Sequence, residues 1–329
     1  MSQTGYFVIS LDFELLYGLS DLPDQKKQRE RVLRGRTAIE RMLQLFSQYG
    51  IHTTWAMVGM LMANNKEELQ HFLPLTKPDY DRFNHDLSLL GDNEAEDPYH
   101  YGGELLQKIR NTPYQEVGSH TFSHYYCMVE GQDESDFEKD LHAAIQMARE
   151  RKLALHSIVF PRNQVNPNYI PILNKYGIKV YRGNERAWIY SATGQKESAI
   201  KRALRLVDSY INVSGMNCYD LRSMECKDGV INIPSSRFLR PYMERLKWLE
   251  KAKIKRIVCQ MKYAAKHHKV FHLWWHPHNF GENLEDNLKN LKMLLACYEE
   301  LNTKYGFQSV TMGELGAIVY ENCGFGRAR

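Results

Sequence analysis

Paired cysteines are missing from this chain of 329 residues. Its six cysteines stand alone, and no two of them are separated by only two residues. Zinc sites built from thiolates usually need such close pairs, so we do not expect one here. Cysteines without partners are typical of reducing compartments, where disulfides are rare. We therefore expect reduced cysteines and a cytoplasmic protein.

Long apolar stretches are missing as well. No segment approaches the ~20 apolar residues that a membrane-spanning helix needs. The apolar run at residues 6–11 is short, lacks a basic flank and ends in an acid, so it does not resemble a signal peptide. We expect neither a membrane span nor export.

A strong charge of either sign is also absent. The formal net charge is +4, which gives no reason to expect a nucleic-acid partner. Apolar residues make up 43% of the chain and charged residues 25%, values that are typical of a globular protein.

Predicted strands and helices alternate along the chain. We expect strands at residues 6–11, 51–58, 116–119, 156–160, 178–181, 230–233, 270–275 and 308–310. Between or after them we expect helices at residues 26–49, 133–152, 167–176, 197–213, 245–269, 284–305 and 312–320. This alternation indicates a mostly parallel sheet with outer helices. The pattern alone does not distinguish an open sheet from a barrel.

Acidic and imidazole side chains follow two of these strands. Asp12 and Glu14 stand two apart on an extended chain, so they point to the same face. Two buried carboxylates repel each other unless a cation or a proton lies between them. His120 and His124 stand four apart, and in a helical turn this spacing places both rings on one face, where they could hold one metal ion.

Two later strands end in further polar groups. Arg162 follows the strand at residues 156–160, and His276 follows the strand at residues 270–275, with His272 and His278 as competing candidates. In α/β barrels, functional residues gather at the carboxyl ends of the strands. The order acid, histidine pair, arginine, late histidine therefore predicts a single site.

These stretches, in this order, resemble the polysaccharide deacetylase family with the NodB-homology fold. The family motif His-[Ser/Thr]-x-x-His is matched by His120-Thr121-Phe122-Ser123-His124. The second predicted strand ends in Val58-Gly59, as is typical of the family. The resemblance runs from Phe7 to about Leu315. It implies a distorted, incomplete (β/α) barrel with long loop insertions. We expect a single catalytic domain over residues 1–329, with an insertion at about 60–114.

The resemblance also implies roles for the residues of the site. His120, His124 and Glu14 would bind a divalent metal ion, most simply zinc, with cobalt, manganese or nickel as alternatives. Asp12 would be the catalytic base and His276 the proton donor. The two acids could also be assigned the other way round, because the family usually has adjacent aspartates.

Further side chains are candidates for orienting groups in the site. Arg162 would pair with Asp12 and keep it ionised. Glu185 is a candidate for orienting His276. Candidate substrate-binding residues are Trp188, as a wall of the acyl pocket, together with Tyr125, Asn163 and Trp275.

The implied activity is metal-dependent removal of an acyl group, most simply N-acetyl, from an amino sugar in surface polysaccharide biosynthesis. The substrate would be a small, nucleotide-linked or lipid-linked sugar. Two alternatives remain open. One is hydrolysis of a cyclic amide or imide on the same fold, and the other is a catalytically inactive carbohydrate-binding protein.

Overall fold

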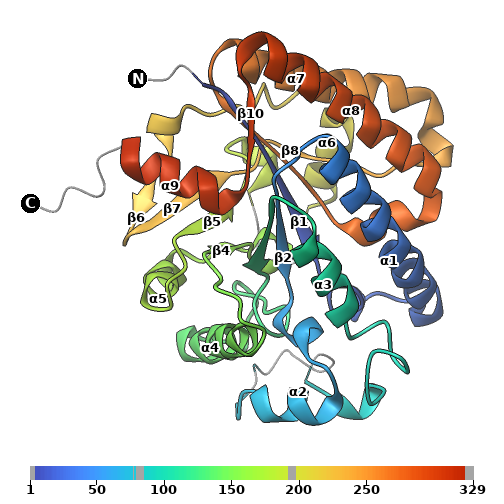
Figure 1. Ribbon diagram of the computed structural model, residues 1–329, viewed down its shortest axis with the longest axis vertical. Coiled ribbons are helices and arrows are strands. Elements are labelled where there is room, and N and C mark those ends of the chain that lie inside the picture. The colour runs from blue at the N-terminus through green and yellow to red at the C-terminus, as the bar shows by residue number, and fades with distance from the viewer. Residues whose placement is uncertain (1–3, 77, 79–84, 192–197, 323–329) are drawn as a thin grey trace, which may run out of the picture.

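A curved sheet of ten strands forms the centre of the protein (Figure 1). The computed structural model describes residues 4–76, 78, 85–191 and 198–322. The strands run in the spatial order β6-β7-β5-β4-β3-β2-β1-β9-β8, and β10 pairs with β1. Their bounds are β1 Tyr6–Phe13, β2 Thr53–Met57, β3 Gln115–Ser119, β4 Ser157–Ile158, β5 Val180–Gly183, β6 Cys226–Lys227, β7 Val230–Pro234, β8 Arg237–Phe238, β9 Val270–Trp275 and β10 Gln308–Val310.

Helices surround this sheet on its outer side (Figure 1). They are α1 Gln25–Gln48, α2 Lys66–Phe72, α3 Gly103–Asn111, α4 Glu134–Glu150, α5 Ile170–Lys175, α6 Ala199–Asp208, α7 Glu250–Lys266, α8 Leu284–Tyr305 and α9 Met312–Asn322. All strand pairs are parallel except β6 with β7. The predicted α/β class and the distorted, incomplete barrel are confirmed. In the part of the chain that the structure describes, no helix is both long and apolar enough to span a membrane.

The predicted helices agree with the structure to within a few residues at most ends. Helix α1 begins after Asp24, whose side chain accepts a hydrogen bond from Lys27 N, and it ends before Gly50, whose φ is +59°. Its apolar face, which includes Val32 and Phe46, is buried. The predicted helix at 197–213 is observed as α6, which ends earlier; Glu197 lies outside the described residues, as does the cysteine at 323.

Strand β1 carries two of the candidate functional residues and pairs with three strands, β2, β9 and β10. All eight of its residues are buried. Phe13 of β1 pairs with Met57 of β2, and Met57 pairs in turn with Ser119 of β3. Glu14 and His120, the next residues of β1 and β3, therefore follow the strands at the same edge of the sheet. The pairing of Leu11 with Trp275 likewise brings Asp12 and His276 together.

The segment that we expect to be an insertion, residues 60–114, carries α2 and α3. Helix α3 packs against α1 and β3. The short strands β6 and β8 were not predicted, because two residues are too few to show a period in the sequence.

Candidate active site

Glu14, His120 and His124 meet at the carboxyl ends of β1 and β3. One ligand atom from each of them lies within 4.8 Å of the others, and all three residues are buried. Glu14 Oε2 is 3.3 Å from His120 Nε2 and 3.0 Å from His124 Nε2. Gly18 packs directly on the Glu14 carboxyl group, where a Cβ atom would approach the carboxyl carbon to 2.0 Å. Glycine at this position therefore leaves the space that the carboxylate occupies.

The chemistry of these three groups suits a divalent cation. His120 Nδ1 is 2.8 Å from the carbonyl oxygen of Val159, which can only accept, so Nδ1 carries a hydrogen and the ring is held with Nε2 toward Glu14. Burial lowers the pKa of His124, against the opposing effect of Glu14, and so favours the neutral form that binds a metal ion. Burial alone would raise the pKa of Glu14, but His276, His124 and His120 hold it well below its usual range. Two imidazoles and one carboxylate form a common zinc-binding set, so the residues fit the ion.

The loop that carries the two histidines is not the helical turn that we predicted. Thr121 and His124 have φ values of 63° and 60°, in the left-handed region. The ring centroids of His120 and His124 are nevertheless 5.1 Å apart. The carboxylate of Asp140, in α4, accepts hydrogen bonds from the backbone N–H groups of Phe122 and Ser123 and so supports the turn. No local spacing in the sequence indicates this long-range contact.

Asp12 lies beside the metal-binding candidates and is held by Arg182, at the end of β5. The guanidinium donates to both carboxylate oxygens, with Nη1–Oδ1 and Nη2–Oδ2 distances of 2.6 and 2.8 Å. Burial opposes ionisation of Asp12, but the charge of Arg182 and that of His276 lower its pKa below the usual value. Arg182 also donates to Ser10 Oγ at 3.0 Å and to Asn163 Oδ1 at 2.8 Å.

Of the three late histidines, His276 has the position of a proton donor. Its Nε2 is 3.6 Å from Asp12 Oδ2 and 3.8 Å from Glu14 Oε1, and its side chain is 26% exposed. His272 and His278 are buried, and burial lowers the pKa of each to about 3. These two imidazoles are therefore neutral at physiological pH and cannot supply a proton.

The prediction that Arg162 pairs with Asp12 is wrong. Arg162 forms an ion pair with Asp21 at the surface, and its guanidinium lies 4.1 Å from the centre of the Tyr126 ring. Arg162 and Asn163 both have a φ of 54°, and this turn carries Asn163 toward Arg182 while Arg162 stays outside. The sequence contained a usable signal, because Arg182 also follows a predicted strand.

Trp275 and Tyr125 do not reach the site as we predicted. Trp275 is fully buried and stacks on Phe280, because it points to the opposite face of β9 from Trp274. It is Trp274 that borders the site, with its ring centroid 5.7 Å from that of His276. Tyr125 is buried, and its hydroxyl donates to Gln132.

The other candidate contacts differ in outcome. The backbone N–H groups of Tyr125 and Asn163 already donate to Thr121 Oγ1 and to Phe160 O, so neither is available to a substrate oxygen. The Asn163 side chain does reach the site, through Arg182. Trp188 is 65% exposed. Glu185 accepts a hydrogen bond from Trp274 Nε1 at 3.3 Å, so it orients the tryptophan, whereas we expected it to orient His276.

A separate cavity of about 820 Å³ lies at the other end of the sheet. It is lined in part by α9 and by the amino-terminal ends of β5 and β7, and its lining includes Lys179, Ile231 and Gly316. Its described lining residues include none of the acids or histidines discussed above. Parallel sheets bind ligands at the carboxyl ends of their strands, so the histidine cluster is the better candidate for a catalytic site.

Comparison with known proteins agrees with this architecture. Residues 24–181 match the sequence model of the polysaccharide deacetylase family. This range includes both histidines of the candidate metal site, and Arg182 lies just beyond it, whereas Asp12, Glu14 and His276 lie outside. The search of curated proteins found no match.

Solved structures share the fold at low sequence identity. A protein from Mycobacterium smegmatis assigned as a polysaccharide deacetylase is 13% identical, with a TM-score of 0.61 over 96% of this chain and 90% of its own. A protein from Pseudomonas aeruginosa with the same assignment is 9% identical, with a TM-score of 0.56 over 96% and 90%. An allantoinase is 10% identical, with a TM-score of 0.54 over 96% and 89%. Residues 24–181 therefore match the polysaccharide deacetylase family in sequence, and the chain shares the fold of these solved structures.

Proposed function

We propose that this protein is a metal-dependent hydrolase that removes an N-acetyl group from an amino sugar. One observation carries the proposal. Asp12, held by Arg182, and His276 lie 3.6 Å apart, next to the place where Glu14, His120 and His124 could hold an ion. A base, a proton donor and a candidate metal site within contact of one another are the requirements for amide hydrolysis.

In the proposed reaction Asp12 accepts a proton and His276 donates one. When bound by Glu14, His120 and His124, a divalent ion, most simply zinc, supplies polarisation of the acyl oxygen and acidification of water. Asp12 takes a proton from water as the water oxygen bonds to the acyl carbon. The carbon–nitrogen bond then breaks, and His276 gives a proton to the nitrogen, which leaves as an amine. The products are a carboxylate and a free amino sugar.

Arg182 keeps the base in its working state. Its two hydrogen bonds fix both oxygens of Asp12, and its charge favours the ionised form. Asn163 and Ser10 hold Arg182 in turn, so the orientation of Asp12 depends on β1, on β5 and on the turn that follows β4.

Metal content and acetate release test the proposal together. We expect purified protein to retain a divalent metal ion, to release acetate from N-acetylglucosamine oligomers, and to lose both properties in His120→Ala. His142→Ala is the matched control, because His142 lies exposed on α4 and contacts Gln146. Equal metal retention by wild type and His120→Ala would contradict the metal site.

The substrates in the same assay distinguish the alternative functions. Ring opening of cyclic amides without acetate release would indicate a cyclic amide hydrolase. Sugar binding without turnover of either class, in metal-loaded protein, would indicate an inactive carbohydrate-binding protein.

Replacing each of the two arginines by methionine tests whether Arg182, and not Arg162, is the partner of Asp12. We expect Arg182→Met to lower kcat/KM by roughly 10- to 100-fold, as is usual when the partner of a catalytic group is removed. Because Arg182 lowers the pKa of Asp12, its removal should also move the acid limb of the pH profile to higher pH. Arg162→Met should change kcat/KM by no more than a few fold and should leave the acid limb of the pH profile in place. A larger loss in Arg162→Met than in Arg182→Met would restore the original assignment.

A further inference from the structure

Helix α6 turns its apolar face to solvent. The side chains of Ile200 and Val207 are exposed, Ile200 to 70%. Ile211 is 65% exposed and extends this face, because its backbone N–H donates to Val207 O and continues the helical turn. Positions 200, 207 and 211 match the helical period, so the three side chains form one stripe. An outer helix normally buries such a stripe in the core, as α1 does, so α6 is oriented in the opposite way.

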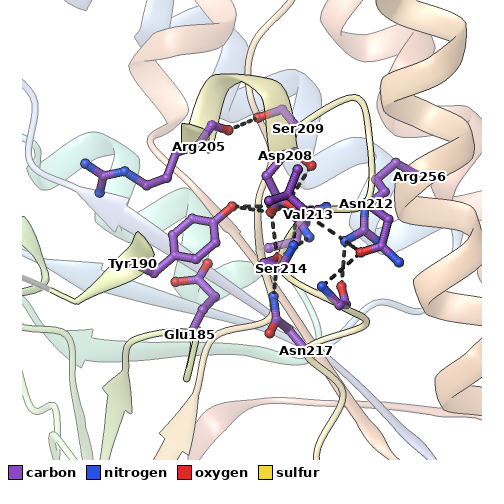
Figure 2. A network of polar contacts seen from close by, with 12 residues as sticks. Glu185, Tyr190, Arg205, Asp208, Ser209, Asn212, Val213, Ser214, Asn217 and Arg256 are labelled. Atoms are coloured by element: carbon purple, nitrogen blue, oxygen red, sulfur yellow. Dashed lines mark hydrogen bonds and ion pairs between the residues drawn. The ribbon is translucent and has the colours of Figure 1, made fainter. Parts of the chain in front are cut away.

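The polar side of α6 holds the helix to the rest of the protein. Among the residues of α6, Asp208 alone is buried. Its carboxylate binds Arg237 of β8 and accepts a hydrogen bond from the Tyr190 hydroxyl at 2.7 Å (Figure 2). Buried polar contacts therefore fix the orientation of the helix, and they leave the apolar stripe outside.

Further exposed apolar side chains lie beside this stripe. Val213 is exposed two residues after Ile211, and Trp188 is exposed in the turn at residues 188–190, which packs against α6. In the part of the chain that the structure describes, residues 200–213 contain all the exposed isoleucine and valine side chains. Single exposed apolar residues are common, but a cluster of them marks an interaction site. We refer to this cluster as the α6 surface; it consists of Trp188, Ile200, Val207, Ile211 and Val213.

Cations border the α6 surface. Lys201 and Arg202 lie in the first turn of α6, and Arg202 is exposed. Lys201 Nζ donates to a neutral serine hydroxyl at 2.7 Å. The buried Asp208 is the only acid from Ser198 to Tyr219. An apolar helix face beside cations is the pattern of helices that lie in the surface of a lipid bilayer, where the cations meet anionic headgroups.

The same features disfavour a second copy of this protein as the partner. In a symmetric pair the two α6 surfaces would face each other, and the cations of one copy would lie against those of the other. Like charges that face each other weaken an interface. Trp188 also suits a bilayer, because tryptophan rings commonly lie at the level of the headgroups.

We propose that the α6 surface binds the headgroup region of an anionic lipid bilayer. Its apolar side chains enter the outer part of the acyl layer, while Lys201 and Arg202 contact lipid phosphates. The surface follows β5, which carries Arg182 at its carboxyl end, so it begins at the edge of the sheet that holds the candidate active site. This inference concerns attachment to lipid and does not depend on the reaction proposed above.

Co-sedimentation with lipid vesicles tests the inference. We expect wild-type protein to bind mixed vesicles of phosphatidylcholine and phosphatidylglycerol, and to bind phosphatidylcholine vesicles more weakly. Ile200→Gln combined with Val207→Gln should lower the affinity for mixed vesicles by roughly 10- to 100-fold, because two apolar side chains no longer enter the acyl layer. Arg202→Gln should lower it about fivefold, the usual contribution of one cation at an anionic membrane surface. Met293→Gln is the matched control and should bind as wild type does, because Met293 is exposed on α8 to an extent similar to that of Val207.

Three results would overturn the inference. They are no sedimentation of wild type with mixed vesicles, equal binding by wild type and the double variant, and equal binding to both kinds of vesicle. A wild-type dimer that the double variant converts to a monomer, measured by light scattering, would also overturn it, in favour of a second copy on this surface. Acetate release from soluble N-acetylglucosamine oligomers should be the same in wild type and the double variant. That assay shows that the variant is folded, and it separates failure of this inference from failure of the proposed function.

Discussion

Replacing Asp12 with asparagine should abolish turnover while the protein keeps its metal ion. Asp12 is not among the residues whose ligand atoms converge; its oxygens are bound by Arg182 and face His276. The asparagine keeps the size of the side chain but cannot take a proton from water. We expect kcat to fall by ~10²–10⁴-fold or more, the usual contribution of a positioned acid–base group. Acetate release and metal analysis on the same preparation measure both effects.

Glu14→Gln is the matched comparison, because it changes the neighbouring acid in the same way. Glu14 Oε2 faces both His120 and His124, so we expect this variant to lose metal as well as activity. Asp21→Asn, at the surface beside Arg162, should keep both. If Asp12→Asn loses the metal and Glu14→Gln retains it, the base and the ligand have been exchanged.

The sequence predicted the parts of this site that depend on strand ends. Parallel strands in register bring their carboxyl ends to one edge, so finding the strands was enough to bring Glu14, His120 and His276 together. The same reasoning could have found Arg182. We chose Arg162 because it matched the position of a family motif, and the left-handed turn at Arg162 and Asn163 was not visible in the sequence.

Contacts between distant segments were not predictable in this way. Asp140, in the middle of α4, supports the loop that carries His120 and His124. In the sequence it is indistinguishable from the other polar residues of an amphipathic helix. Trp274 and Trp275 are equivalent candidates in the sequence. Which of them borders the site depends on which face of β9 each side chain occupies. The register between β1 and β9, in which Leu11 pairs with Trp275, would have identified the tryptophan that borders the site.

Asp208 is the clearest case of a residue whose role the sequence did not reveal. Its fully buried carboxylate accepts hydrogen bonds from Tyr190, from the backbone of Val213 and Ser214, and from the Ser214 hydroxyl (Figure 2). It also binds Arg237 of β8. The carboxylate therefore joins α6, the turn at Tyr190, the loop that follows α6 and strand β8.

We expect Asp208→Asn to lower the free energy of unfolding by about 3–5 kcal/mol, the usual cost of leaving a buried charge without its partner. The variant keeps the shape of the side chain but leaves the charge of Arg237 buried and uncompensated. Urea unfolding measures the loss. Asp220→Asn is the control, because Asp220 is exposed and pairs with Lys269 at the surface, where such pairs contribute about 0–1 kcal/mol.

The pH dependence of this loss tests its electrostatic origin. Burial alone would raise the pKa of Asp208, but the charge of Arg237 and the hydrogen bonds from Tyr190 and Ser214 lower it below the usual value. A carboxyl group with a depressed pKa in the folded state stabilises the protein fully above its unfolded pKa of about 3.9, and the stabilisation is lost as the pH falls through the folded value. The stability difference between wild type and Asp208→Asn should therefore be constant from neutral pH down to about pH 5 and shrink below about pH 4. A difference that stays constant through the acid range would mean that packing, and not the buried charge, is what Asp208 contributes.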